Sequence, residues 1–225
     1  MGRVRAPSAY AARVTMLLLV IAGVVALVDW WAVAGHRKPV ESVAKPLTMA
    51  LLIAVAAVAG DVPGDVRAWL VLGAVFGLIG DIALLADGET RFMIGLGSFA
   101  IGHLAYVVAA VSLEFDPVWT IPGFVFIAGL LGYRFATRTL PGAIAHGGSV
   151  LGGAVAFYAS VISAMVVTAW ATTIVVAAVG AMLFATSDWV LGHRRFVGTL
   201  PLGPLAIMVP YHVGQALLVV GIATG

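Results

Sequence analysis

The sequence predicts an all-α integral membrane protein, a bundle of eight transmembrane helices, and two observations carry this prediction. Of the 225 residues, 62% are hydrophobic and only 10% are charged, whereas a soluble domain has about 45–50% apolar and about 25% charged residues. The apolar residues also gather in runs of about 20, the length that an α-helix needs to cross the hydrocarbon layer. This composition excludes a water-soluble globule and a disordered chain.

Eight apolar runs, separated by short polar, glycine or proline breaks, form one membrane domain over residues 1–225. The expected helices cover approximately 14–34, 44–60, 66–86, 92–113, 118–136, 146–168, 170–192 and 200–223. Polar turn clusters at 61–65 and 87–91 mark two of the connections. Only the region around Trp170 separates the sixth run from the seventh.

The first run has two interpretations. Arginines within residues 3–13 precede it, and Ala32-Val33-Ala34 resembles the cleavage site of a secretory signal peptide. The pair Trp30-Trp31 instead fits the aromatic belt at a membrane interface, with Asp29 beside it. We expect a retained helix, with cleavage as the alternative.

Lysine and arginine are unevenly divided between the two ends of the expected bundle. Eight follow odd-numbered helices (Arg37, Lys38, Lys45, Arg91, Arg134, Arg138, Arg194 and Arg195) and four lie at the other end (Arg3, Arg5, Arg13 and Arg67). This bias predicts cytoplasmic odd-numbered connections and external termini. Because the basic residues lie at helix ends and the net charge is only +2, we expect no nucleic-acid partner.

Five ionisable side chains fall within the expected helices: Asp29, Asp81, His103, Asp188 and His212. A charged residue at bilayer depth costs about 2.5–3.5 kcal/mol on insertion scales, so such residues face the interior of a bundle or a wet cavity. There is no cysteine, which excludes disulfides and thiolate sites. A metal site built from these histidines and aspartates is an alternative, but we expect neither metal nor cofactor.

Asp81 and Asp188 share a sequence context, because each follows a Gly-Ala pair (Gly73-Ala74 and Gly180-Ala181) after six intervening residues. Their helices are four spans apart and run in the same direction. This suggests a duplicated four-helix unit related by an axis along the membrane normal. Both carboxylates then lie at one level, about 6–8 Å from the same helix ends at 1.5 Å per residue.

Further polar side chains lie at compatible depths and converge on this level: Lys45, His103, Tyr106, Tyr158, Ser187, Tyr211 and Gln215. His103 and Tyr106 are three residues apart, and Tyr211 and Gln215 are four apart, so each pair shares a helix face. We expect Asp81, Asp188, His103 and Tyr211 to face one internal cavity.

Four blocks in this order carry a family resemblance: Lys45-Pro46; Gly80-Asp81 with Phe92, Gly95, Phe99, His103 and Tyr106; Gly180-Ala181 with Phe184 and Ser187-Asp188; and Tyr211 with Gln215. Together they resemble the lysoplasmalogenase family of membrane proteins, also called YhhN-like, from about residue 14 to the end. Pro210, directly before Tyr211, is not part of the pattern and is expected to kink the helix.

The resemblance implies a multi-pass hydrolase of the cell membrane. Its substrate would be a lysophospholipid, a lysoplasmalogen whose vinyl ether bond is cleaved to a fatty aldehyde and glycerophospho-ethanolamine or -choline. The expected catalytic residues are Asp81, Asp188, His103 and Tyr211, and the expected substrate-binding residues are Lys45 (for the phosphate), Tyr106, Tyr158, Ser187 and Gln215.

The chemistry suits these residue types. Hydrolysis of a vinyl ether needs an acid to protonate the double bond, a base to orient water and negative charge near the oxocarbenium ion. Two carboxylates in a low-dielectric cavity supply all three. Intramembrane aspartates and a duplication are also typical of transporters, so a lipid transporter or flippase is the alternative function. A non-catalytic scaffold leaves the buried ionisable groups unexplained.

Overall fold

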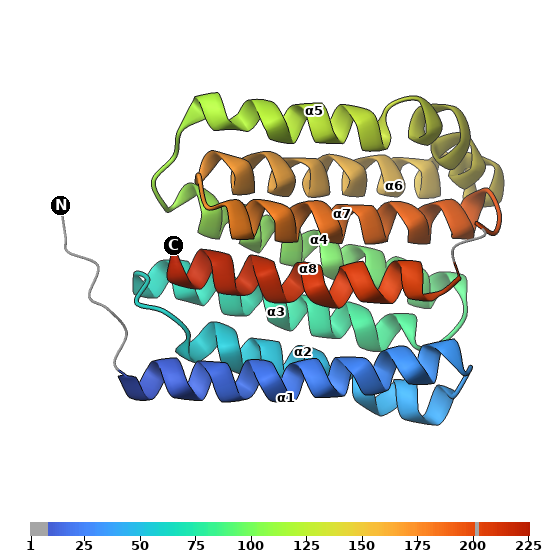
Figure 1. Ribbon diagram of the computed structural model, residues 1–225. Coiled ribbons are helices and arrows are strands. Elements are labelled where there is room, and N and C mark those ends of the chain that lie inside the picture. Colours follow the sequence, from blue (N-terminus) through green and yellow to red (C-terminus); the bar gives the residue numbers. More distant parts are fainter. Residues whose placement is uncertain (1–8, 201–202) are drawn as a thin grey trace.

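A computed structural model describes residues 9–200 and 203–225, and in these residues the chain forms helices and no strands (Figure 1). The eight helices are α1 (Ala9–Ala34), α2 (Lys38–Val58), α3 (Gly64–Leu84), α4 (Glu89–Val111), α5 (Thr120–Leu131), α6 (Leu140–Ala171), α7 (Val175–Phe196) and α8 (Leu205–Thr224). The prediction of an all-α, eight-helix bundle is confirmed. Seven of the apolar helical stretches in the described residues are long enough to cross a membrane.

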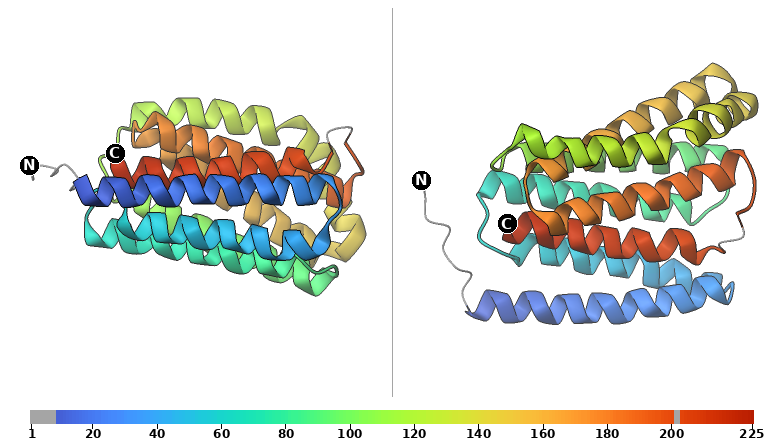
Figure 2. Two further views of the ribbon diagram at one scale, coloured as in Figure 1. Left: turned by 60° about the horizontal axis from the view of Figure 1, so that its bottom comes forward. Right: turned by 45° about the horizontal axis from the view of Figure 1, so that its top comes forward.

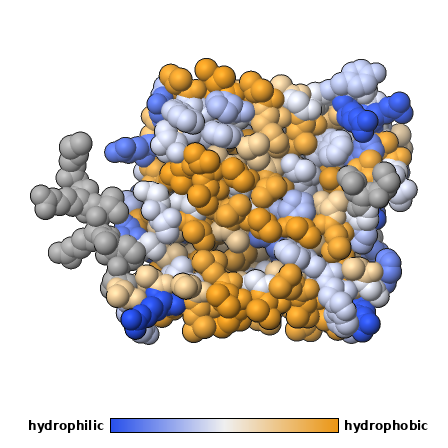
Figure 3. Space-filling model, viewed as in Figure 1, coloured by the Kyte–Doolittle hydropathy of each residue, from blue (hydrophilic) through white to orange (hydrophobic). Residues whose placement is uncertain are grey.

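The surface has the banded pattern of a membrane protein. A broad hydrophobic belt runs around the visible face, and hydrophilic side chains gather at its two ends (Figure 3). The connections that follow α1, α3, α5 and α7 lie at one end, opposite the C-terminus (Figure 1). The chain is therefore a multi-pass membrane protein, while the sidedness drawn from the charge count stays a prediction.

The fifth segment is shorter than the expected 118–136. A single 3₁₀ turn over Pro117–Trp119 precedes α5, and α5 ends where Gly132 leaves helical geometry (ψ −114°). The chain then forms a wide π-helical turn over Phe135–Thr139 before α6 begins. Two residues of this turn, Phe135 and Thr139, line the cavity described below.

The boundary between the sixth and seventh helices lies after Trp170. The α6 helix continues to Ala171, and the turn consists of three β-branched residues at 172–174, a type that loses rotamer freedom in a helix. The Thr172 hydroxyl accepts a hydrogen bond from the backbone N–H of Ile174. Thr173 takes a positive φ of 63°, which reverses the chain.

The first helix packs into the bundle against α2 and α8. Figure 2 shows α1 along one side of the molecule and α5 on the opposite side. Asp29 and Ala32, both close to the suggested cleavage site, are fully buried. The helix is thus an integral part of the fold, and the preceding Arg3 and Arg5 lie outside the described residues.

The two halves of the chain pack in a similar way. Helix α2 contacts α3, and α3 contacts α4, while α6 contacts α7, and α7 contacts α8. Each of the pairs α3/α4 and α7/α8 meets at glycines: a Cβ added to Gly102 would lie 2.9 Å from the carbonyl oxygen of Gly73, and one added to Gly214 would lie 2.8 Å from that of Gly180. Gly73 and Gly180 are the matched positions of the suggested duplication, which stays a prediction that this packing supports.

Candidate active site

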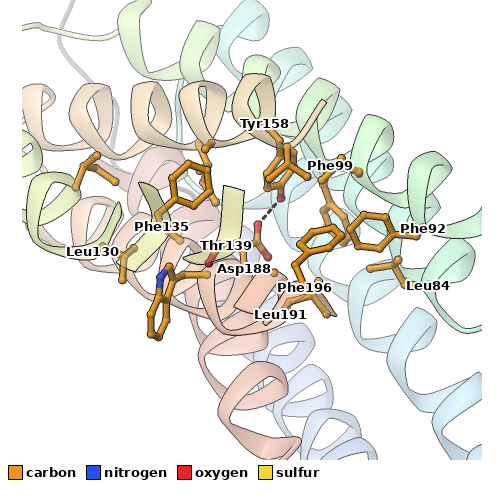
Figure 4. Close-up of a pocket in the computed structure, with 18 residues that line it drawn as sticks. Leu84, Phe92, Phe99, Leu130, Phe135, Thr139, Tyr158, Asp188, Leu191 and Phe196 are labelled. Atoms are coloured by element: carbon orange, nitrogen blue, oxygen red, sulfur yellow. Dashed lines mark hydrogen bonds between the residues drawn. The ribbon is translucent and has the colours of Figure 1, made fainter. Parts of the chain in front are cut away.

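An apolar cavity lies between α4, α5, α6 and α7, and Asp188 stands in its wall (Figure 4). It encloses about 700 Å³, including the space at its mouth. Its lining is almost entirely aliphatic and aromatic, and the polar side chains in it are Thr139, Tyr158 and Asp188, with the indole of Trp189. The hydroxyl of Tyr158, on α6, donates a hydrogen bond to Oδ2 of Asp188.

Asp81 lies in a closed polar cluster that the cavity does not reach. Its carboxylate is fully buried and forms an ion pair with Lys45 of α2, Nζ to Oδ1 3.1 Å. The Tyr211 hydroxyl of α8 donates to Oδ2 of Asp81 at 2.6 Å. Two neighbouring helices, α2 and α8, thus provide the partners of a carboxylate on α3, and this arrangement explains how a charged pair is tolerated at bilayer depth.

Lys45 is therefore not a free cation at the head-group level. Only 7% of the residue is exposed, and its ammonium group lies between Asp81 and the face of the Tyr211 ring, 5.9 Å from the ring centroid. The phosphate-binding role expected for Lys45 stays a prediction, and this geometry does not favour it.

An aromatic layer separates the two carboxylates. Phe99 of α4 lines the cavity on one side, and its ring meets the Tyr211 ring edge-on at 5.9 Å on the other. Phe184 packs against both rings, at 6.1 Å and 5.2 Å. Asp81, His103 and Tyr211 are not among the residues that line this cavity.

His103 lies within the aromatic layer, beside Tyr158. The two ring centroids are 5.4 Å apart, and the Phe184 ring lies nearly perpendicular to the His103 ring, with their centroids 4.6 Å apart. Only 1% of His103 is exposed, and neither ring nitrogen has a hydrogen-bond partner among the described residues. His103 thus lies next to Tyr158, which donates to Asp188, but it forms no hydrogen bond with Asp188 or with the Asp81 cluster.

Tyr106 and Gln215 form a pair behind the Asp81 cluster. The Tyr106 hydroxyl donates to Oε1 of Gln215 at 2.9 Å, and both side chains are buried. The Gln215 amide nitrogen lies against Gly77, where an added Cβ would approach it to 2.9 Å. This hydrogen bond connects α4 to α8 beside α3, and neither residue lines the cavity, so the substrate-binding roles expected for Tyr106 and Gln215 stay predictions.

Ser187 is bound to the backbone of α8. Its hydroxyl donates to the carbonyl oxygen of Ile207 at 2.9 Å. Pro210 lacks the N–H that would bond the carbonyl oxygen of Ala206, four residues before it, and Ser187 bonds the carbonyl oxygen of the next residue, Ile207. Pro210 does not displace Tyr211 from Asp81, and the substrate-binding role expected for Ser187 stays a prediction.

Asp29 is a second fully buried acidic residue, where the adjacent tryptophans predict an interfacial one. Its Oδ2 lies 4.0 Å from Nδ1 of His212. The Trp30 indole donates to the same Nδ1 at 3.1 Å. The spacing of the two tryptophans indicated an interface, and only the packing of α1 on α8 reveals this contact.

No group of three histidine, aspartate or glutamate side chains in the described part of the chain is arranged to hold a metal ion. His103 and His212 lie in separate surroundings, the first beside Tyr158 and the second against α1.

Comparison with known proteins places these residues in a family context. Residues 40–222 match the model of the YhhN family. A Mycobacterium bovis protein named lysoplasmalogenase is 33% identical over 197 residues, which cover 79% of this chain and 69% of that protein. Bovine lysoplasmalogenase TMEM86A is 29% identical over 159 residues, 65% of this chain and 62% of its own length. Mouse lysoplasmalogenase TMEM86B is 31% identical over 163 residues, 70% of this chain and 65% of its own. No solved structure gives a significant match.

Proposed function

Because this chain belongs to the YhhN family, we propose that it is a hydrolase of the cell membrane that cleaves the vinyl ether bond of a lysoplasmalogen. The names of its mycobacterial, bovine and mouse relatives support this substrate. The products are a fatty aldehyde and a glycerophospho-alcohol such as glycerophospho-ethanolamine or -choline.

The observation that carries the proposal is the single carboxyl group, that of Asp188, in the wall of a largely apolar cavity. Apolar walls suit the hydrocarbon chain of a lipid, and a small number of placed polar groups is typical of ligand pockets. The cavity lies among membrane-spanning helices, where a lysolipid can reach it from the bilayer. In this position the Asp188 carboxyl group contacts the vinyl ether of the lipid, the group that reacts with acid.

In the proposed reaction, Asp188 is first the proton donor and later the proton acceptor. The carboxylic acid gives its proton to the outer carbon of the C=C–O group, and an oxocarbenium ion forms. The resulting carboxylate faces this cation, stabilises it, and accepts a proton from the attacking water molecule. The hemiacetal that forms then breaks its C–O bond to release aldehyde and alcohol. General acid–base catalysis of this kind contributes about 10²- to 10⁴-fold.

The remaining residues have distinct proposed roles. Tyr158 orients the Asp188 carboxyl group through its hydrogen bond, and His103, beside Tyr158 with both nitrogens unpartnered, orients the water. Asp81, with Lys45 and Tyr211, forms a polar core that holds α2, α3 and α8 together behind the aromatic layer. Asp81 is thus proposed to act in positioning rather than by proton transfer to the lipid.

The test is hydrolysis by the purified protein in D₂O, followed by immediate reduction of the aldehyde and mass spectrometry. We expect the fatty alcohol obtained by reducing the aldehyde to carry one deuterium at the carbon next to the former aldehyde carbon. Saturated 1-alkyl and 1-acyl lysolipids of the same length serve as controls and should remain intact. Cleavage of the acyl control, or transfer of intact lipid across vesicles without aldehyde formation, would contradict the proposal.

A further inference from the structure

A group of basic side chains borders the cavity at the end of the bundle where α5 joins α6. The π-helical turn carries Arg138, with Arg134 just before it, and the charges of both act on His193 near the end of α7. Arg195 follows on the same last turn. Figure 3 shows hydrophilic side chains gathered at this end of the molecule, beside the α5–α6 connection.

Arg195 is the member of this group that is tied to the cavity. Its guanidinium carbon lies 5.1 Å from the centroid of the Phe92 ring, and Phe92 lines the cavity, as does Phe196. The side chain is exposed, and no carboxylate of the described residues forms an ion pair with it. A guanidinium group held over an aromatic ring, with its donors free, is well suited to bind a phosphate.

Asp188 and Arg195 lie on one face of α7. Seven residues correspond to almost two helical turns, so both side chains project in nearly the same direction, about 10 Å apart along the axis. Leu191 and Gly192, between them, line the cavity. The cavity wall on α7 thus leads from the carboxyl group to the guanidinium group.

A buried hydroxyl group lies between these two ends. Thr139 is 2% exposed and lines the cavity, and its Oγ1 has no hydrogen-bond partner among the described residues. It packs near Gly192, where an added Cβ would lie 3.7 Å from its Cγ2. An unpartnered hydroxyl in an apolar wall indicates that a ligand with a polar group passes this level.

These distances fit the polar part of a lysolipid. Seven bonds separate the carbon that is protonated in a vinyl ether from the phosphorus atom, and at about 1.2 Å per bond of an extended chain they span about 8 Å. With the reacting carbon at Asp188, the glycerol carbons lie beside Thr139 and the phosphate reaches Arg195. Lys45, ion-paired with Asp81, is not available for this role.

We propose, building on the hydrolase function above, that Arg195 at the mouth of the cavity binds the phosphate group of the lysolipid substrate and sets its register, so that the vinyl ether bond lies at Asp188. The phosphate is the recognised chemical group. A bilayer phospholipid offers the same group, and the experiment separates these two sources.

The first measurement is steady-state hydrolysis in neutral detergent micelles, with lysoplasmalogen and with 1-alkenylglycerol, which lacks the phosphate. For Arg195→Gln we expect KM for lysoplasmalogen to rise about tenfold or more, as for the loss of one charge-assisted contact, with an unchanged kcat. KM for 1-alkenylglycerol should not change, and Arg195→Lys should recover part of the loss. The matched control is Arg37→Gln, since Arg37 lies at the same end of the bundle and also over an aromatic ring, 3.9 Å from the Trp31 centroid, but Trp31 does not line the cavity.

The second measurement is direct binding of an uncleavable 1-alkyl lysophospholipid, which does not depend on catalysis. Weaker binding by Arg195→Gln, with wild-type binding by Arg37→Gln, supports the subsite even if the wild-type protein hydrolyses no vinyl ether, in which case only the hydrolase proposal fails. Equal KM increases for both substrates, or equal binding by both variants, would overturn the phosphate subsite. An effect seen only in anionic vesicles and absent in neutral micelles would assign Arg195 to bilayer lipid and overturn it as well.

Discussion

Asp81 and Asp188 stand in matched sequence contexts, yet their surroundings differ in kind. Asp81 is closed off by an ion pair with Lys45 and a hydrogen bond from Tyr211, whereas Asp188 has one tyrosine donor and faces an apolar cavity. The Asp81 carboxylate thus has a partner on each oxygen, from α2 and from α8. The cavity-facing position of Asp188 is the one that suits the proton exchange proposed above.

Within the suggested duplication, one amino-acid difference between the two halves fits this contrast. Tyr211 lies three residues before Gly214, and Phe99 lies three residues before Gly102, at the two equivalent glycine contacts. The tyrosine hydroxyl reaches Asp81, but a phenylalanine has no hydroxyl to offer. Phe99 instead lines the cavity, so the second carboxylate stays accessible on that side.

The largest expected effect is on stability, from Asp81→Asn. The change leaves Lys45 buried without a countercharge, and breaking a buried ion pair in this way costs about 3–5 kcal/mol. Thermal unfolding in detergent measures the loss, and the double variant Lys45→Met/Asp81→Asn should recover most of it. A single variant that is as stable as wild type but inactive would instead restore Asp81 to the catalytic pair expected from the sequence.

The next effect is on turnover, from Asp188→Asn. The amide cannot supply the proton, so the rate of aldehyde release should fall about 100-fold or more, while the unfolding temperature stays near that of wild type. Asp87→Asn, at an exposed position between α3 and α4, is the control with the same chemical change. Near wild-type turnover in Asp188→Asn would remove the proton-donor role.

A matched pair of hydroxyl deletions sharpens the comparison further. Tyr211→Phe removes a buried hydrogen bond to a charged group and should lower the free energy of unfolding by about 1.5–3 kcal/mol. Tyr158→Phe should mainly lower turnover, because it frees the Asp188 carboxyl group to rotate away from the lipid. Both variants are measured for unfolding and for hydrolysis, and the same profile in both would show that the two carboxylates do not differ as described.

The smallest effect is expected from Ser187→Ala, adjacent to Asp188. The variant loses one hydrogen bond to Ile207, about 1 kcal/mol, and should keep most of its activity, because the hydroxyl points to α8 rather than to the cavity. Hydrolysis assays and thermal unfolding check this. A strong loss of turnover at unchanged stability would assign Ser187 to the substrate.

The sequence by itself determined the fold class and the number of helices, and it indicated the candidate site residues, whose roles stay predictions. Hydrophobic length and the cost of burying charge are local properties, so apolar runs mark the helices, and aspartates within them mark the polar interior. The glycine spacing that repeats around Asp81 and Asp188 is also visible in the sequence, because spacing along one helix is a local property. The short α5 and the end of α6 at Ala171 were less accessible, because both depend on backbone geometry at Gly132 and Thr173.

Only the tertiary structure decided which polar groups meet. Lys45 could be placed at the right depth from the sequence, but whether it faces Asp81, lipid or a head group depends on how α2 is rotated against α3. The burial of Asp29 against His212 likewise requires the packing of α1 on α8. Hydropathy gives the depth of a side chain and not its partner across the bundle, because small residues at helix contacts set rotation and distance. For this reason two aspartates with the same local pattern have different environments, one within a closed ion-pair cluster and the other at a cavity.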